Sequence, residues 1–201
     1  NSTCYNFTMS CRQWLLLSLL VGACNESPDK TTIPVAPTAP QLVNFGVTIA
    51  GAEFGSDKAS FCNEDIGQLG QDYFYNKPWT FNWFQQEGID LFRIPFRWER
   101  IQPLLGGPLN ESELDRLIKI LRWSEKKDVR VILDLHNFGR YSLRHNEKIV
   151  SAVVNKKYNG ELLVSIADLI DVWAKIISAC DDAGVTPWAL GLMNEPHDMG
   201  F

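Results

Sequence analysis

Short apolar runs alternate with longer amphipathic stretches from about residue 42 onward. The apolar runs are rich in Val, Ile, Leu and Phe and have the length of strands buried on both faces. The pattern predicts four strands, at residues 43–50, 89–95, 129–135 and 188–193.

The stretches between these runs carry apolar residues at helical spacing, with signals for helix starts and ends. A Pro opens the first stretch, a Ser and an Asp three residues apart predict a capping box in the second, and a Gly closes the third. The expected helices are residues 79–87 after Pro78, a helix from the Ser112 and Asp115 capping box to about Lys127, and a helix through residues 166–177 that ends near Gly184.

Strands that alternate with helices in this order predict an α/β fold with right-handed parallel crossovers. Four strand-helix units in about 160 residues correspond to half of a (β/α)8 TIM barrel of about 250 residues. A doubly wound sheet is the structural rival. No GxGxxG or phosphate-loop pattern follows the first strand, so the sequence gives little support to a nucleotide-binding fold.

The first 40 residues differ in character from the rest of the chain. One Arg, a short apolar run at residues 14–21 and small residues before Cys24 predict a secretory signal within residues 1–24, and the run is too short to span a bilayer. The ending resembles a bacterial lipobox, which would make Cys24 a lipidation site; an ordinary signal peptide is the alternative. Residues 25–40 are rich in Pro and Thr and are expected to be a linker. The folded domain is expected at residues 41–201.

Composition narrows the range of functions. The 201 residues are 45% hydrophobic with a formal net charge of −5, and no basic run is present, which excludes nucleic acid as a partner. Three scattered His and the absence of CxxC and HExxH spacings lead us to expect no metal and no cofactor. Cys62 and Cys180 are either bridged or free, which sequence cannot decide.

Polar residues interrupt the apolar pattern where three predicted strands end. In a parallel barrel these ends meet at the catalytic face, so the side chains are expected to converge on one cleft. Any one of them alone is explained equally well by an ion pair or a backbone hydrogen bond. The three groups are Arg93, Arg97 and Glu99; Asp134, His136 and Asn137; and Asn194 and Glu195.

Four sequence blocks, taken in order, resemble glycoside hydrolase family 5, specifically its endo-β-1,4-glucanase members. The resemblance implies a (β/α)8 barrel and a retaining hydrolase with two carboxyl groups about 5–5.5 Å apart. The blocks are residues 46–55 (GVTIAGAEFG), 88–103 (GIDLFRIPFRWERIQP), 134–141 (DLHNFGRY) and 190–197 (LGLMNEPH).

The resemblance makes Glu195 the general acid/base, which protonates the leaving glycosidic oxygen and then deprotonates water. This role implies a partly desolvated, acid-crowded cleft around Glu195. Asn194 would bind the 2-hydroxyl of the sugar that is cleaved.

Five further residues are implied to bind substrate or orient the site. Arg93 and His136 would hold the carboxylate nucleophile ionised and oriented, Asn137 and Tyr141 would line adjacent subsites, and His197 would position the Asn-Glu turn or face substrate.

The family places its nucleophile on a Glu at the seventh strand, beyond the four strands predicted here. Glu53, Glu99 and Asp134 lie in blocks where the family has no nucleophile, so none is assigned that role. The sequence is therefore expected to be part of a longer protein and inactive alone. Trp98 and Phe54 either pack at the barrel rim or stack on sugar, and packing is the commoner cause of such aromatics.

The expected function is endo-acting hydrolysis of β-1,4-glucan by a secreted or cell-surface protein, lipid-anchored in a bacterial envelope and monomeric at full length. A β-mannanase or another β-glucanase of the same family is one alternative. A carbohydrate-binding surface lipoprotein without catalysis is another.

Overall fold

The computed structural model describes residues 45–200. The predicted signal segment, the Cys24 lipidation site and the linker at residues 25–40 lie outside these residues. Within residues 45–200, no helix combines the length and apolar character that crossing a bilayer requires.

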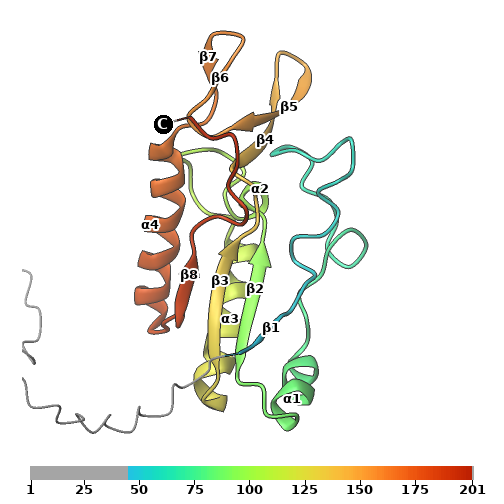
Figure 1. Ribbon diagram of the computed structural model, residues 1–201, viewed down its shortest axis with the longest axis vertical. Helices are drawn as coiled ribbons and strands as arrows, with labels where there is room; N and C mark the ends of the chain where they lie inside the picture. The colour runs from blue at the N-terminus through green and yellow to red at the C-terminus, as the bar shows by residue number, and fades with distance from the viewer. Residues whose placement is uncertain (1–44, 201) are drawn as a thin grey trace, which may run out of the picture. The chain divides into compact units, whose positions relative to one another are not determined.

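Four parallel strands form the main sheet in the order β1-β2-β3-β8, with their carboxyl ends at one edge (Figure 1). The central pair runs in register from Leu91 opposite Arg130 to Phe96 opposite Leu135. The strands are β1 (Val47–Thr48), β2 (Leu91–Phe96), β3 (Arg130–Leu135) and β8 (Ala189–Gly191).

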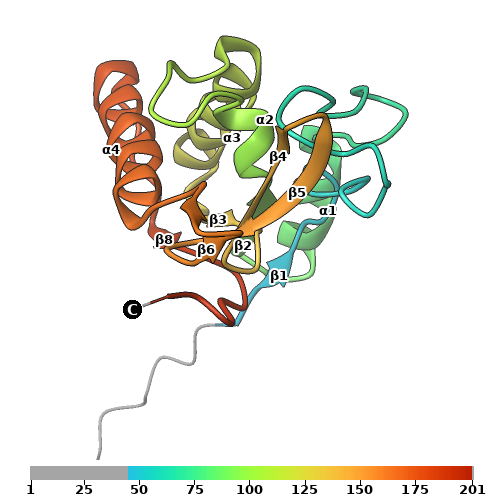
Figure 2. The same ribbon diagram turned by 90° about the horizontal axis from the view of Figure 1, so that it is seen from above.

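Three long helices connect these strands and cover one face of the sheet (Figure 2). They are α1 (Pro78–Gln86), α3 (Glu111–Lys127) and α4 (Ile166–Ala183). Between helices and sheet lies an aromatic cluster, in which Phe81 packs edge-on against Phe92 and tilted against Trp123, with ring centroids 5.3 and 4.8 Å apart. The predicted strand-helix order is confirmed.

Two details of the predicted elements were wrong. Asn110, not Ser112, caps α3, because its side chain accepts hydrogen bonds from the backbone N–H groups of Ser112 and Glu113. The capping box occurs instead at the start of α4, between Ser165 and Asp168. The first and fourth strands are shorter than predicted, since only part of each apolar run pairs with its neighbour.

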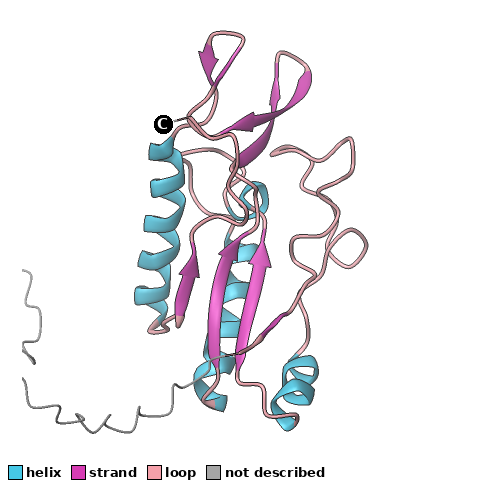
Figure 3. Ribbon diagram, in the orientation of Figure 1, coloured by secondary structure: helices cyan, strands magenta, loops and turns pink. Residues whose placement is uncertain are grey.

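The segment between β3 and α4 contains two hairpins that the sequence pattern did not predict. They lie beyond the carboxyl ends of the main sheet and outside its hydrogen-bonded order (Figure 3). A short helix, α2 (Trp98–Ile101), also follows β2 directly. The hairpin strands are β4 (Arg140–His145) with β5 (Lys148–Val153), and β6 (Lys157–Tyr158) with β7 (Glu161–Leu162).

The two cysteines of the domain are both buried and free. This resolves the alternative that sequence left open. Burial raises the pKa of the Cys180 thiol to about 11, so it stays protonated at neutral pH.

Candidate active site

Side chains from β2, β3 and the segments that follow β3 and β8 form a closed ring near the carboxyl edge of the sheet. Arg93 lies on β2, Asp134 on β3, His136 just after β3, and Asn194 three residues beyond β8. Backbone hydrogen bonds fix the two segments outside the strands, from the N–H of His136 to Phe96 O (2.9 Å) and from the N–H of Asn194 to Leu135 O (2.8 Å).

The Asp134 carboxylate organises this ring. Its Oδ2 atom accepts from Arg93 Nη2 at 2.8 Å and lies 2.9 Å from His136 Nδ1. The same Arg93 nitrogen donates to Asn194 Oδ1, and Asn194 Nδ2 lies 3.4 Å from His136 Nε2. Asp134 is almost fully buried while the side chain of Arg93 remains 31% exposed, so the ring has an anchored side and a side open to solvent.

These contacts fix the orientation of the Asn194 amide and the position of the proton on the His136 ring. A guanidinium has only donors, so it fixes the amide oxygen of Asn194 toward Arg93 and the amide nitrogen toward His136. The His136 N–H then points from Nδ1 to Asp134, which leaves Nε2 as an acceptor. The amide of Asn194 is therefore held in one orientation.

Glu195 follows this ring directly and is exposed. Its backbone is in the left-handed region, with φ +40°. Its side chain makes no hydrogen bond or ion pair among residues 45–200. The expected partly desolvated, acid-crowded cleft is thus not formed by the described residues, because four strands and their loops surround this carboxyl on one side only.

Asn137 and Tyr141 do not line a subsite, contrary to the prediction. Asn137 is fully buried: its side chain accepts from the backbone N–H of Trp98 (2.8 Å) and donates to Glu99 Oε2 (2.8 Å). Tyr141 is 1% exposed, and its hydroxyl donates to the backbone carbonyls of Gln102 and Pro103, both at 2.8 Å. Burial raises the pKa of Tyr141. Both residues stabilise the base of the loops.

Trp98 and Phe54, for which the sequence left both packing and sugar stacking open, differ in their burial. Trp98 is fully buried and packs edge-on against Tyr141 at 5.2 Å, so it is a packing residue. Phe54 is 44% exposed and lies edge-on against Phe74.

His197 lies in a cluster with two charged neighbours. Arg140 Nη1 lies 2.9 Å from His197 Nε2, and Arg140 Nη2 donates to Asp198 Oδ2 at 3.1 Å. His197 Nδ1 is 2.8 Å from the same Asp198 oxygen. Hydrogen bonds from His197 and then Arg140 lower the pKa of Asp198. Of the two predicted roles for His197, this geometry fits the positioning of the turn.

Sequence reasoning placed Asp134 among the strand-end residues of the expected cleft but gave it no role, and it did not select Arg140. A signal for Asp134 was available: it lies two residues before His136 in extended chain, so both side chains project to the same face. No local signal marked Arg140, because its partners follow 57 and 58 residues later.

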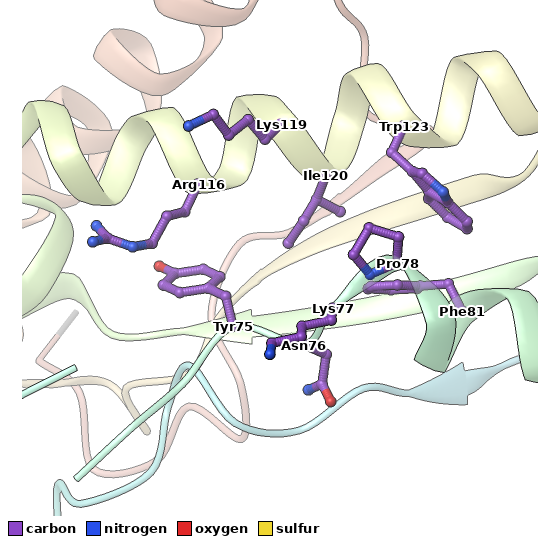
Figure 4. A pocket seen from close by; sticks show the side chains of 9 residues that line it. All are labelled: Tyr75, Asn76, Lys77, Pro78, Phe81, Arg116, Lys119, Ile120 and Trp123. Atoms are coloured by element: carbon purple, nitrogen blue, oxygen red, sulfur yellow. The ribbon is translucent and has the colours of Figure 1, made fainter. Parts of the chain in front are cut away.

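An apolar cavity of about 270 Å³ lies away from this ring, between α3 and the segment that leads into α1 (Figure 4). The residues that line it include Phe81, Ile120 and Trp123, together with Lys77 and Lys119. It contains none of the strand-end polar residues, so it is distinct from the candidate active site. Within residues 45–200, no cluster of three or more His, Cys, Asp or Glu side chains is arranged to hold a metal ion.

The fold agrees with comparisons to known proteins. A family model described as Cellulase (glycosyl hydrolase family 5) matches residues 46–201. The chain belongs to glycoside hydrolase family 5. Within this family, endo-beta-1,4-glucanase B of Emericella nidulans is 30% identical over 170 residues, covering 82% of this chain and 44% of that protein.

Two solved family 5 structures superimpose on the chain. Pseudomonas stutzeri endoglucanase Cel5A, in complex with cellobiose, gives a TM-score of 0.58 at 30% identity and covers 77% of this chain and 41% of its own. XacCel5A in complex with cellopentaose gives 0.59 at 31% identity, with 77% and 43% covered. These matches confirm the predicted partial (β/α)8 barrel. The chain spans less than half the length of these relatives.

Proposed function

We propose that the full-length protein is a retaining endo-β-1,4-glucanase that hydrolyses β-glucan. Family 5 membership and the endoglucanase names of its relatives support this proposal. The observation that carries it is the placement of an exposed carboxyl, Glu195, next to a pre-oriented amide at the carboxyl edge of a parallel sheet. Barrel enzymes bind substrate at this edge.

Glu195 is the proposed general acid/base. In the first step its proton passes to the glycosidic oxygen as the bond to the anomeric carbon breaks, and in the second its carboxylate takes a proton from the attacking water. Its exposure leaves the carboxyl accessible to a sugar chain that lies across the sheet edge.

Asn194 is the proposed ligand of the 2-hydroxyl of the sugar that is cleaved. Because Arg93 and His136 hold its amide in one orientation, binding requires no reorientation at the moment of reaction. One amide N–H and one lone pair of Oδ1 remain for the sugar. A hydrogen bond to the 2-hydroxyl strengthens as positive charge develops on the ring.

Arg93 and His136 also present positive and polar groups to the open side of the ring. We propose that they orient the nucleophile, a carboxylate that family resemblance places at the seventh barrel strand. The two carboxyl groups must then lie about 5–5.5 Å apart.

Hydrolysis of several polysaccharides by the protein in its natural full length tests the substrate class. We expect a rapid fall in the viscosity of carboxymethylcellulose and little release from mannan or laminarin. Release from mannan alone contradicts the glucanase proposal and favours the mannanase alternative.

Glu195→Gln tests the chemistry. The variant is expected to lose about 10²–10⁴-fold in kcat while it still binds cellooligosaccharides, because the amide cannot transfer the proton. Glu87→Gln, an exposed change beyond the end of α1, is the matched control. Unchanged turnover in Glu195→Gln, or binding without turnover in the unaltered protein, contradicts the hydrolase proposal.

We also propose that the protein is exported and held at the cell surface by a lipid on Cys24. The support is the lipobox-like sequence and the Pro/Thr-rich stretch that follows it. Metabolic labelling with a fatty acid should mark the unaltered protein and not Cys24→Ala. Equal labelling of both contradicts the anchor.

A further inference from the structure

The carboxyl of Glu195 has no side-chain partner among residues 45–200, so its direction depends on the backbone that carries it. That backbone is strained. Glu195 and Asp198 both adopt left-handed conformations, with φ +40° and +59°. A residue such as Glu195, which is neither Gly, Asn nor Asp, remains in this region only where its surroundings hold it there.

Backbone hydrogen bonds fix both ends of the loop that contains Glu195. At the start, the N–H of Asn194 donates to Leu135 O at 2.8 Å. At the end, the N–H of Gly200 donates to Val154 O at 3.1 Å, and Asn155 Nδ2 donates to Gly200 O at 3.0 Å. The strained part lies between these anchors, and it is exposed.

Arg140 holds the middle of this loop. Its Nη2 donates to Asp198 Oδ2 at 3.1 Å, and its Nη1 lies 2.9 Å from His197 Nε2. Nη1 also donates to the carbonyl of Phe138 at 2.8 Å, which ties the guanidinium to the loop after β3. With the His197 N–H directed from Nδ1 to Asp198 at 2.8 Å, Nε2 is left as the acceptor for Arg140 Nη1 at 2.9 Å.

We propose that Arg140 is a positioning residue for Glu195 and acts through His197 and Asp198. This inference rests on the proposed acid/base role of Glu195. By fixing the two residues that follow Pro196, the guanidinium holds the left-handed turn that points the Glu195 carboxyl toward the scissile bond. Displacement of a catalytic group by about 1 Å costs about 100-fold in rate, so a loosened turn should slow proton transfer specifically.

Arg140→Met in the full-length protein tests the inference, with two aryl β-cellotriosides that differ in leaving group. Phenol needs protonation by Glu195 as it leaves, whereas 2,4-dinitrophenol leaves as a stable anion without it. We expect kcat/KM to fall about 100-fold on the phenyl substrate and about tenfold or less on the dinitrophenyl substrate. Added azide should restore kcat on the dinitrophenyl substrate, since this nucleophile needs no general base.

Three further variants separate positioning from a general loss of structure. Arg144→Met, on the same strand, removes a guanidinium that pairs with Glu64 at 2.7 Å, and it should stay within about twofold on both substrates. Arg140→Lys replaces the two donor nitrogens of the guanidinium with one ammonium. Its kcat/KM should lie between the values of the unaltered protein and Arg140→Met. Asp198→Asn loosens the same cluster from its exposed side and should reproduce the leaving-group dependence if Arg140→Met does not fold.

The inference is overturned if kcat/KM of Arg140→Met and Asp198→Asn falls equally on both substrates or does not fall at all. Glu195→Gln separates its failure from that of the proposed function. If Glu195→Gln shows the leaving-group dependence and the Arg140 and Asp198 variants do not, only the positioning role is wrong. If Glu195→Gln lacks it, the acid/base assignment itself is wrong, and the positioning role falls with it.

Discussion

Two polar networks lie at the carboxyl ends of the same strands, and neighbouring residues belong to different ones. His136 is part of the solvent-facing ring with Arg93, Asp134 and Asn194, and its side chain is 20% exposed. Asn137, the next residue, is fully buried in a network around Glu99. The backbone turns at this point and sends the two side chains to opposite sides of the sheet edge.

The networks differ in what remains unsatisfied. The buried Glu99 carboxylate accepts from Asn137 Nδ2 (2.8 Å), the N–H of Ser142 (2.8 Å) and Arg97 (3.4 Å). These bonds occupy it within the fold, so it contributes to stability. In the ring, Asn194 is 9% exposed, and it keeps one amide N–H and one Oδ1 lone pair without a partner among residues 45–200. The two networks therefore differ in their carboxyl and amide groups: three donors hold the Glu99 carboxylate inside the fold, whereas Asn194 keeps open bonding capacity beside the exposed Glu195.

The largest expected effect in this comparison is on stability, from Glu99→Ala. Removing the carboxylate leaves Arg97, which is 6% exposed, as an uncompensated buried charge. The free energy of unfolding should fall by about 3–5 kcal/mol, as for other broken buried ion pairs. Urea denaturation measures it, with the exposed Glu87→Ala, expected within about 0.5 kcal/mol, as the control. A loss no larger than that of the control contradicts the assignment of Glu99 to stability.

The neighbours Asn137 and His136 provide the most direct contrast. Asn137→Ala leaves the backbone N–H of Trp98 without its acceptor, so the free energy of unfolding should fall by about 1–3 kcal/mol. His136→Ala should change stability little and reduce kcat/KM by about tenfold or more through a loosened Asn194. Thermal denaturation and cellooligosaccharide hydrolysis of both variants measure this. If Asn137→Ala instead reduces kcat/KM and His136→Ala instead reduces stability, the assignment of one network to stability and the other to function is wrong.

Gly191→Ala probes the anchored side of the ring. A Cβ at this position would lie 2.5 Å from Asp134 Oδ1, so the carboxylate must move. We expect a fall of about tenfold in kcat/KM, equivalent to about 1.4 kcal/mol. In an Asp134→Ala background the same change should add much less, because the closest contact, to Oδ1, is gone and only the contacts to Cα and Cβ at 3.3 Å remain. Full additivity of the two losses contradicts this explanation.

The smallest expected effect is on the pH dependence of stability, through Asp198 in the turn that follows Glu195. Hydrogen bonds from His197 and Arg140 lower the pKa of Asp198 below its unfolded value of about 3.9. The stabilisation is therefore present above about pH 4 and is lost as the pH falls through the folded-state pKa. The Tm of the unaltered protein should exceed that of Asp198→Asn slightly at pH 6, and the difference should shrink as the pH is lowered below 4. A difference that does not change as the pH falls contradicts this assignment.

The strand-helix order was predictable because each main element carries its own period. The Gly184 stop of α4 is a local signal, and the structure places this Gly in the left-handed conformation that such a stop requires. The hairpin β4–β5 was missed because its strands, although six residues long, are mixed in polarity and partly exposed, and β6–β7 was missed because its strands have two residues each. β4 and β5 pair across a turn at Asn146 and Glu147, both with positive φ, and neither residue is a glycine that would have marked the turn.

The amino-acid sequence by itself determined the alternation of strands and helices, the family and the set of polar residues at the strand ends. Each follows from local periodicity or from residues close together in the chain. Only the tertiary structure decided which of these side chains meet. Asn194 joins Arg93 across 101 residues, and Asn137 turns inward to Glu99 across 38. Such partners are selected by strand register and burial, which are properties of the packed chain.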